Sequence, residues 1–105
     1  MGLDAVIYGK DERRLASKRL GNTAHIAFLR GAVIPVVGEQ SVVVSKILYS
    51  GTHAGDSLAP AELEPLSREL QSLQRSSDTE VRSFARDMLD LIESVLKHDT
   101  AIHFV

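Results

Sequence analysis

The stretch SDTEVRSFARDMLDLIESVLKHDTAIHFV, residues 77–105, joins a long amphipathic pattern to a short apolar segment. Residues 77–80 match the capping-box pattern, in which side chains satisfy free backbone N–H groups at the start of a helix. The last turn carries Lys97 and His98, at the end where the helix dipole favours cations. The apolar residues between these ends recur at helical spacing and predict one wide buried face: Val81, Phe84, Ala85, Met88, Leu91, Ile92, Val95 and Leu96.

The closing segment AIHFV, residues 101–105, predicts a strand because it is rich in residues that favour β-structure. Its natural partner is LDAVIY at residues 3–8, which predicts a first strand on the same grounds. The polar residues 9–12 predict a hairpin turn, and residues 14–20 predict a second strand near the sheet edge, where charge discourages aggregation.

The middle of the chain predicts helices. Asn22 is a good N-cap for a helix that Pro35 is expected to end. Ile26, Leu29 and Val33 recur at helical spacing and give this helix one apolar stripe. Residues 41–50 (SVVVSKILYS) leave helix and strand open, with a slight preference for helix. Pro60 and Pro65 both lack a backbone donor, so the next helix is expected to begin with both near its first turn. The expected architecture is one α+β domain over residues 1–105, in which a small sheet from the N-terminal hairpin and the C-terminal strand is covered by three or four helices.

Composition narrows the classes of function. The chain has 105 residues, of which 44% are hydrophobic and 25% are charged, as in ordinary globular domains. The absence of cysteine excludes disulfides and thiolate chemistry. There is no long apolar run and no signal-peptide pattern, so we expect a cytoplasmic protein with no membrane partner. A net charge of −2 and few aromatic residues argue against a nucleic-acid partner.

The stretch YSGTHAGDSLAP, residues 49–60, is the main candidate for chemistry. In one interpretation it is a glycine-containing linker in which Asp56 or Ser57 caps the following helix. In the other, His53, Asp56 and Ser57 bind a small ligand. No cofactor and no metal site is predicted, because a metal needs at least three ligands and no spacing here supplies them. Neither a phosphate-binding loop nor a Gly-x-Ser-x-Gly motif is present, so no catalytic residue is assigned.

Asp4 is the fourth candidate ligand-binding residue, because it interrupts an apolar strand. A buried, unpaired carboxylate would be costly. Asp4 is therefore expected on the exposed face of the sheet, or paired across strands with Arg19 or His103. His103 alternates with Ile102 and Phe104, so it is expected to face solvent.

Several segments together resemble small uncharacterised bacterial proteins, some of which are similar to immunity proteins of toxin systems. These segments are MGLDAVIY at residues 1–8, RLGN at 19–22, KILYSGTHAGD at 46–56 and the closing strand. The resemblance implies a small protein-binding module and transfers no catalytic residue.

Two hypotheses follow. The first is a non-enzymatic interaction module, such as a protein that neutralises a toxin or a homodimeric accessory protein. The second is a small ligand- or metal-binding protein or enzyme that uses the 50–57 loop. The first is favoured because the sequence offers few polar groups that could converge on a pocket. A homodimer is expected to join through the closing strand or through a helix face, because so short a chain has limited interior for its apolar stripes.

Overall fold

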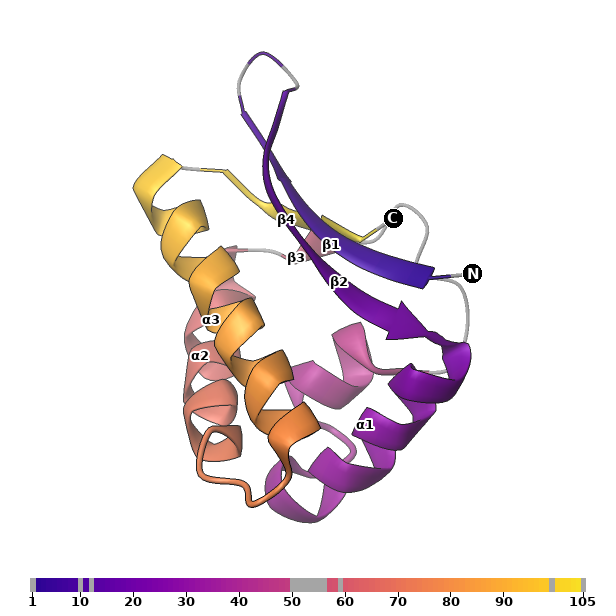
Figure 1. The fold of residues 1–105 in the computed structure, drawn as a ribbon. Helices are drawn as coiled ribbons and strands as arrows, with labels where there is room; N and C mark the ends of the chain where they lie inside the picture. Colours follow the sequence, from indigo (N-terminus) through magenta and orange to yellow (C-terminus); the bar gives the residue numbers. More distant parts are fainter. Residues whose placement is uncertain are drawn as a thin grey trace.

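A four-stranded sheet with the helices gathered on one side is seen in the computed structural model, which describes residues 2–9, 11, 13–49, 57–58, 60–98 and 100–104 (Figure 1). This arrangement confirms the predicted α+β class. The elements in chain order are β1 (Gly2–Tyr8), β2 (Arg14–Asn22), α1 (Thr23–Val37), η1 (Val43–Ile47), β3 (Ser57–Leu58), α2 (Pro60–Leu73), α3 (Thr79–His98) and β4 (Ile102–Phe104).

The strands lie in the order β2-β1-β4-β3, and every neighbouring pair is antiparallel. Ala5 of β1 lies opposite Phe104 of β4, which confirms the predicted pairing of the first and last strands.

The sequence did not predict β3, because a two-residue strand is too short to show alternation. Ser57 belongs to this strand and α2 begins only at Pro60, so the interpretation of Ser57 as a helix cap is wrong.

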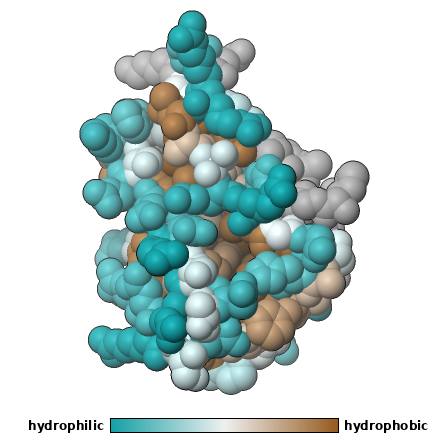
Figure 2. All heavy atoms as spheres, viewed as in Figure 1, coloured by the Kyte–Doolittle hydropathy of each residue, from teal (hydrophilic) through white to brown (hydrophobic). Residues whose placement is uncertain are grey.

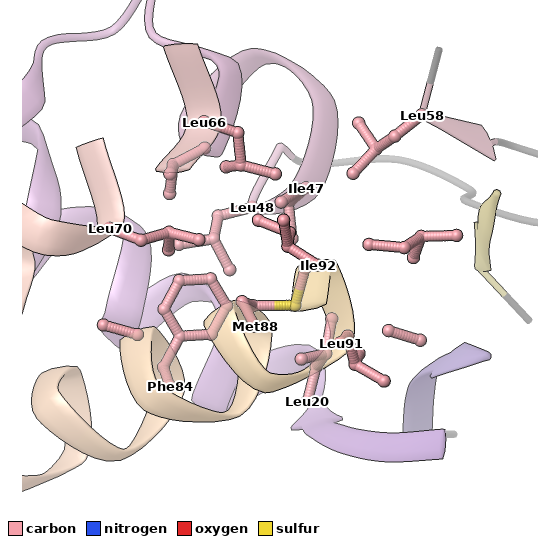
Figure 3. Close-up of a cluster of buried hydrophobic side chains, with 14 of the residues drawn as sticks. Leu20, Ile47, Leu48, Leu58, Leu66, Leu70, Phe84, Met88, Leu91 and Ile92 are labelled. Atoms are coloured by element: carbon pink, nitrogen blue, oxygen red, sulfur yellow. The ribbon is translucent and has the colours of Figure 1, made fainter. Parts of the chain in front are cut away.

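The core lies between the sheet and the helices, where side chains of all four helical segments meet (Figure 3). Met88 of α3 is fully buried and belongs to the same core cluster as Ile47 of η1 and Leu70 of α2, all labelled in Figure 3. The predicted apolar face of α3 is confirmed with one exception, since Leu96 is 72% exposed. Leu96 follows buried Val95, and the turn of about 100° per residue carries it around to the solvent side.

Helix α1 begins as predicted, with the Asn22 side chain accepting a hydrogen bond from the His25 N–H at 2.9 Å. Its end was predicted wrongly, because the helix continues through Pro35 to Val37. Pro35 lies in the last turn, so the hydrogen bond that it removes and the crowding of its ring affect only the end of the helix. The Gly38 N–H then closes the helix by donating to the carbonyl of Ile34 at 2.8 Å.

Residues 41–50 contain a helical segment, as preferred from the sequence, but its geometry is a single π-helical turn. The Leu48 N–H donates to the carbonyl of Val43 at 2.8 Å, which is the five-residue spacing of a π-helix. The Glu69 carboxylate of α2 accepts from the N–H groups of Val42 and Val43 at 3.1 and 2.9 Å. These two bonds satisfy backbone donors at the start of the turn and fasten it to α2.

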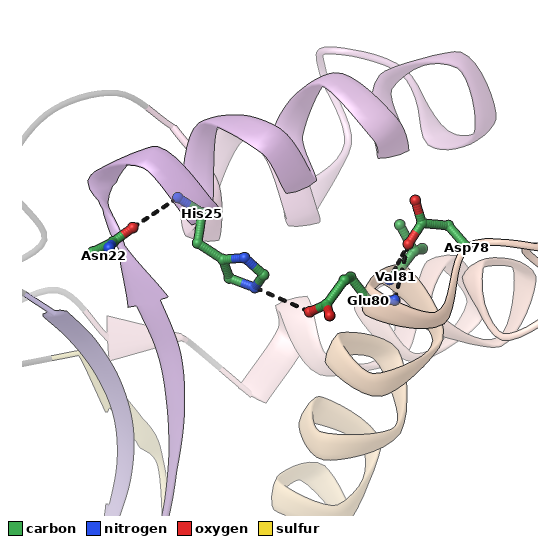
Figure 4. Close-up of polar contacts among 5 residues, drawn as sticks. All are labelled: Asn22, His25, Asp78, Glu80 and Val81. Atoms are coloured by element: carbon green, nitrogen blue, oxygen red, sulfur yellow. Dashed lines mark hydrogen bonds and ion pairs between the residues drawn. The ribbon is translucent and has the colours of Figure 1, made fainter.

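The starts of the last two helices differ in detail from expectation. Pro60 is the first residue of α2, but Pro65 lies in the second turn rather than the first. In α3 the N-cap is Asp78 and not Ser77, since one Asp78 carboxylate oxygen accepts from the N–H groups of Glu80 and Val81 at 2.9 and 3.4 Å (Figure 4). An aspartate accepts as well as a serine at this position, so the sequence pattern fitted two neighbouring registers.

Candidate functional site

Two of the four predicted ligand-binding residues, His53 and Asp56, lie outside the described residues. The other two, Asp4 and Ser57, lie on the face of the sheet that points away from the helices, here called the outer sheet face. Ser57 is opposite His103, and His103 is opposite Val6, which is two residues from Asp4. Because opposite residues of antiparallel strands share a face, these side chains belong to one surface.

Asp4 pairs with Arg19, as one of the sequence alternatives predicted. The Arg19 Nε lies 3.8 Å from Asp4 Oδ1, and the two residues are direct partners of β1 and β2. Asp4 is 33% exposed, so the carboxylate keeps contact with water. The charge in an apolar strand therefore has a structural explanation, and an ion pair of this kind stabilises a fold by less than about 1 kcal/mol.

His103 faces away from buried Ile102 and Phe104, as its alternation predicts, but it is half-buried rather than fully solvated. Its ring lies 5.7 Å from the ring of Tyr8 at an interplanar angle of 55°, a tilted aromatic contact across β1 and β4. The contact covers one side of the imidazole. Within the described residues, no group of three or more His, Asp or Glu side chains is placed to hold a metal ion.

A second surface, on the solvent side of α1, is unusual because it is apolar. We call Ala24, Ala27, Phe28, Gly31 and Pro35 the outer face of α1, because all five are exposed and they recur at helical spacing opposite buried Ile26, Leu29 and Val33. None of the five side chains is polar or charged. Phe28 is 49% exposed, and Val36 in the last turn is 56% exposed.

The composition of α1 accounts for this surface. The sequence TAHIAFLRGAVIPVV contains one permanently charged residue, Arg30. A helix on a protein surface normally carries polar residues on its solvent side, and a helix that is apolar all round is normally buried. Sequence reasoning found only the buried stripe. The near absence of charge over 15 residues was the signal that could have revealed the second apolar face.

Phe28 has an aromatic neighbour at the start of α1. The His25 ring lies 6.3 Å from the Phe28 ring at an interplanar angle of 24°, a nearly parallel arrangement. On its other side, His25 Nε2 lies 3.7 Å from the Glu80 carboxylate of α3 (Figure 4). His25 therefore lies between the exposed aromatic ring and the start of α3.

The apolar surface is visible from one side of the molecule. Figure 2 shows tan and brown atoms on the α1 side of the molecule, at the lower right. Polar atoms dominate much of the rest of this view. Two other large apolar side chains are well exposed, Leu15 on β2 at 46% and Leu96 on α3. They lie on other elements, and single exposed apolar residues of this kind are ordinary.

Comparisons with protein-family models, with curated proteins and with solved structures found no match to this chain. Within the described part of the chain, no helix has both the length and the apolar character needed to cross a bilayer. The surfaces described above are therefore the basis for a functional proposal.

Proposed function

We propose that this chain is a non-enzymatic protein-interaction module that binds a protein partner through the outer face of α1. One observation carries the proposal: all five residues that form the solvent side of this 15-residue helix are apolar or glycine, and Phe28 among them is half-exposed. Contiguous apolar surface with an aromatic residue at its centre is typical of protein contact sites.

The energetics favour a partner for this face. Covering an exposed aromatic side chain contributes about 1.5–3 kcal/mol for full burial, and Phe28 still has about half of its surface to bury. The alanines and Gly31 add little area, but they allow another backbone to come close. A folded partner with an apolar groove or helix would gain most from such a surface.

The biological role proposed for the module is that of an immunity-like protein, which neutralises a partner toxin in the cytoplasm. This part rests on the resemblance of residues 1–8, 19–22 and 46–56 to proteins of that kind, and on the helix face as a binding surface. The module itself needs no cofactor, because binding and blocking a toxin requires no chemistry.

The test uses an affinity bait made from this chain. Phe28→Asp places a charge at the centre of the outer face of α1 and is expected to remove partner binding. Leu15→Asp makes the same change at a nearly equally exposed site on β2 and is the matched control.

Captured proteins are identified by mass spectrometry, purified and titrated by calorimetry. Growth rescue in cells that express the captured protein tests the toxin-neutralising role. Equal binding by Phe28→Asp and the wild type would exclude this face.

A second candidate function is ligand binding at the outer sheet face. It is favoured by the alignment of Ser57, His103 and Asp4 on one surface of the sheet. Zinc and inorganic phosphate are the probes, added to isotopically labelled protein. Saturable chemical-shift changes at these residues that His53→Ala or His103→Ala abolishes would support this function, and unchanged spectra would exclude it for both probes.

A further inference from the structure

We infer that the outer face of α1 packs against the same face of a second copy of this chain, with the two helices antiparallel and Gly31 nearest the two-fold axis. The inference rests on the proposed function, because it uses the same surface. A second copy and a toxin would compete for this face. Three features of the described residues lead to it: the shape of the face, its lack of charge, and the partial charges of the helix dipole at the two ends of α1.

The shape suits close packing of two helices. Gly31 lies at the middle of the outer face of α1, and a methyl group placed there would meet no atom within 4 Å. A glycine at such a position lets a second helix approach at the short end of the usual 8–10 Å range. With the axis at Gly31, residue numbers that face each other sum to 62. Ala27 then faces Pro35 of the second copy, and Phe28 faces that copy's Ile34.

The charge of the face suits self-association in particular. In a two-fold dimer every charge near the axis meets its own copy, so charged faces repel. The five residues of the outer face of α1 carry no charge, and Arg30 lies on the flank of the helix. A partner of opposite charge would gain nothing here, whereas an identical apolar face gains the burial of both surfaces.

The helix ends point to the antiparallel orientation. Helix α1 has no acidic residue in its first turn and no basic residue in its last turn, so its own sequence leaves both ends of the dipole uncompensated. Glu39 is exposed just after the C-terminus, where its negative charge is unfavourable. In an antiparallel pair each Glu39 lies beside the N-terminus of the other helix, near residue 23, where a carboxylate is favourable.

A membrane surface is the other occupant of an apolar helix face, and the sequence of α1 argues against it. Helices that lie in the bilayer interface carry several Lys or Arg residues on the polar side. Helix α1 has only Arg30, and the whole chain has a net charge of −2. A second copy is therefore the better match.

The first test measures mass against concentration by sedimentation equilibrium, from about 1 μM to 1 mM, a range that covers weak interfaces of this size. The wild type is expected to approach the mass of two chains. Gly31→Gln is expected to raise the dissociation constant at least about tenfold, which corresponds to the loss of about 1.4 kcal/mol. It should leave the monomer folded, since the position has open space and glutamine favours helix more than glycine does. Leu15→Asp is the control that should dimerise normally.

The second test determines the orientation, and the absence of native cysteine makes it free of background. An equimolar mixture of Ala27→Cys and Pro35→Cys is expected to form the mixed disulfide under mild oxidation. Ala27→Cys alone is not, because antiparallel packing separates the two copies of residue 27 by about 12 Å along the axis. Rapid cross-linking of Ala27→Cys alone would show parallel packing and overturn the arrangement.

The outcomes separate this inference from the proposed function. A single-chain mass over the whole concentration range overturns the dimer, whereas a Phe28-dependent complex with a different protein would still support the interaction module. Concentration-dependent dimers that Gly31→Gln weakens support the inference even if no other protein is captured. If the whole protein binds saturably to phosphatidylserine vesicles and forms no dimer in solution, the outer face of α1 is assigned to a membrane surface instead.

Discussion

Asp78 shows how much one side chain at a helix start can contribute. Its carboxylate accepts from the N–H groups of Glu80 and Val81, so Asp78→Ala leaves both donors without this partner. We expect the free energy of unfolding to fall by about 1 kcal/mol, the usual cost of losing an N-cap. Urea denaturation followed by circular dichroism measures the change. Ser77→Ala is the control, and a larger loss there than at Asp78 would restore the cap position expected from the sequence.

Glu69 provides a second prediction for a single residue. Its carboxylate holds the N–H groups of Val42 and Val43, and Glu69→Ala leaves two partly buried donors without an acceptor. The expected loss is about 1–3 kcal/mol of unfolding free energy, the cost of unsatisfied buried groups. Glu64→Ala is the matched control, because Glu64 is exposed on the same helix. Equal midpoints for the two variants in thermal melts would contradict this role.

The sequence had no means of locating the Glu69 contact or the pairing of Ser57 with His103. Residues 42 and 69 are 27 positions apart, and only the packing of η1 against α2 brings them together. Long-range contacts of this kind depend on tertiary structure, whereas the Asn22 cap depends on residues three positions apart and was predicted correctly. Local chemistry was therefore readable. Among contacts between distant residues, strand pairings with strong β patterns were predicted, and the polar contact between η1 and α2 was not.

At the scale of elements, α3 tests the interpretation of its apolar face. Met88→Ala is expected to lower the free energy of unfolding by about 2–5 kcal/mol, because it removes a fully buried side chain and leaves a cavity. Leu96→Ala removes a side chain of similar size that is 72% exposed, so we expect a change of no more than about 0.5 kcal/mol. Urea midpoints of both variants provide the comparison. Similar losses would mean that Leu96 is covered in solution.

Element types with strong periodicity were predictable, and their irregular parts were not. The α3 pattern extends over five turns, so its helix and buried stripe followed directly from the sequence. Residues 41–50 gave mixed signals because the segment forms a π-helical turn, which has no simple side-chain period. The outer face of α1 was not predicted for another reason: the stripe of Ile26, Leu29 and Val33 was enough to predict a helix, and alanine, glycine and proline on the opposite side are weak signals of an apolar surface.

At the scale of the whole molecule, β4 connects the two halves of the sheet. It lies between β1 and β3, and Phe104 is buried against the helices. Phe104→Ala is expected to cost about 3–5 kcal/mol and to lower the urea midpoint of the entire protein in one transition. Leu15→Ala on the edge strand β2 is the control and should have little effect. A separate early transition in Phe104→Ala would show that the helices unfold independently of the sheet.

The inner position of β4 also affects the order in which the protein acquires its structure during translation. Of the described elements β4 is synthesised last, yet β1 bonds to it on one side and β3 on the other. Until residues 102–104 leave the ribosome, the nascent chain carries the β1–β2 hairpin with the inner edge of β1 open. An open edge of this kind can pair with strands of other chains. A nascent chain stalled before residue 101 would therefore expose a site for aggregation that β4 covers in the finished protein.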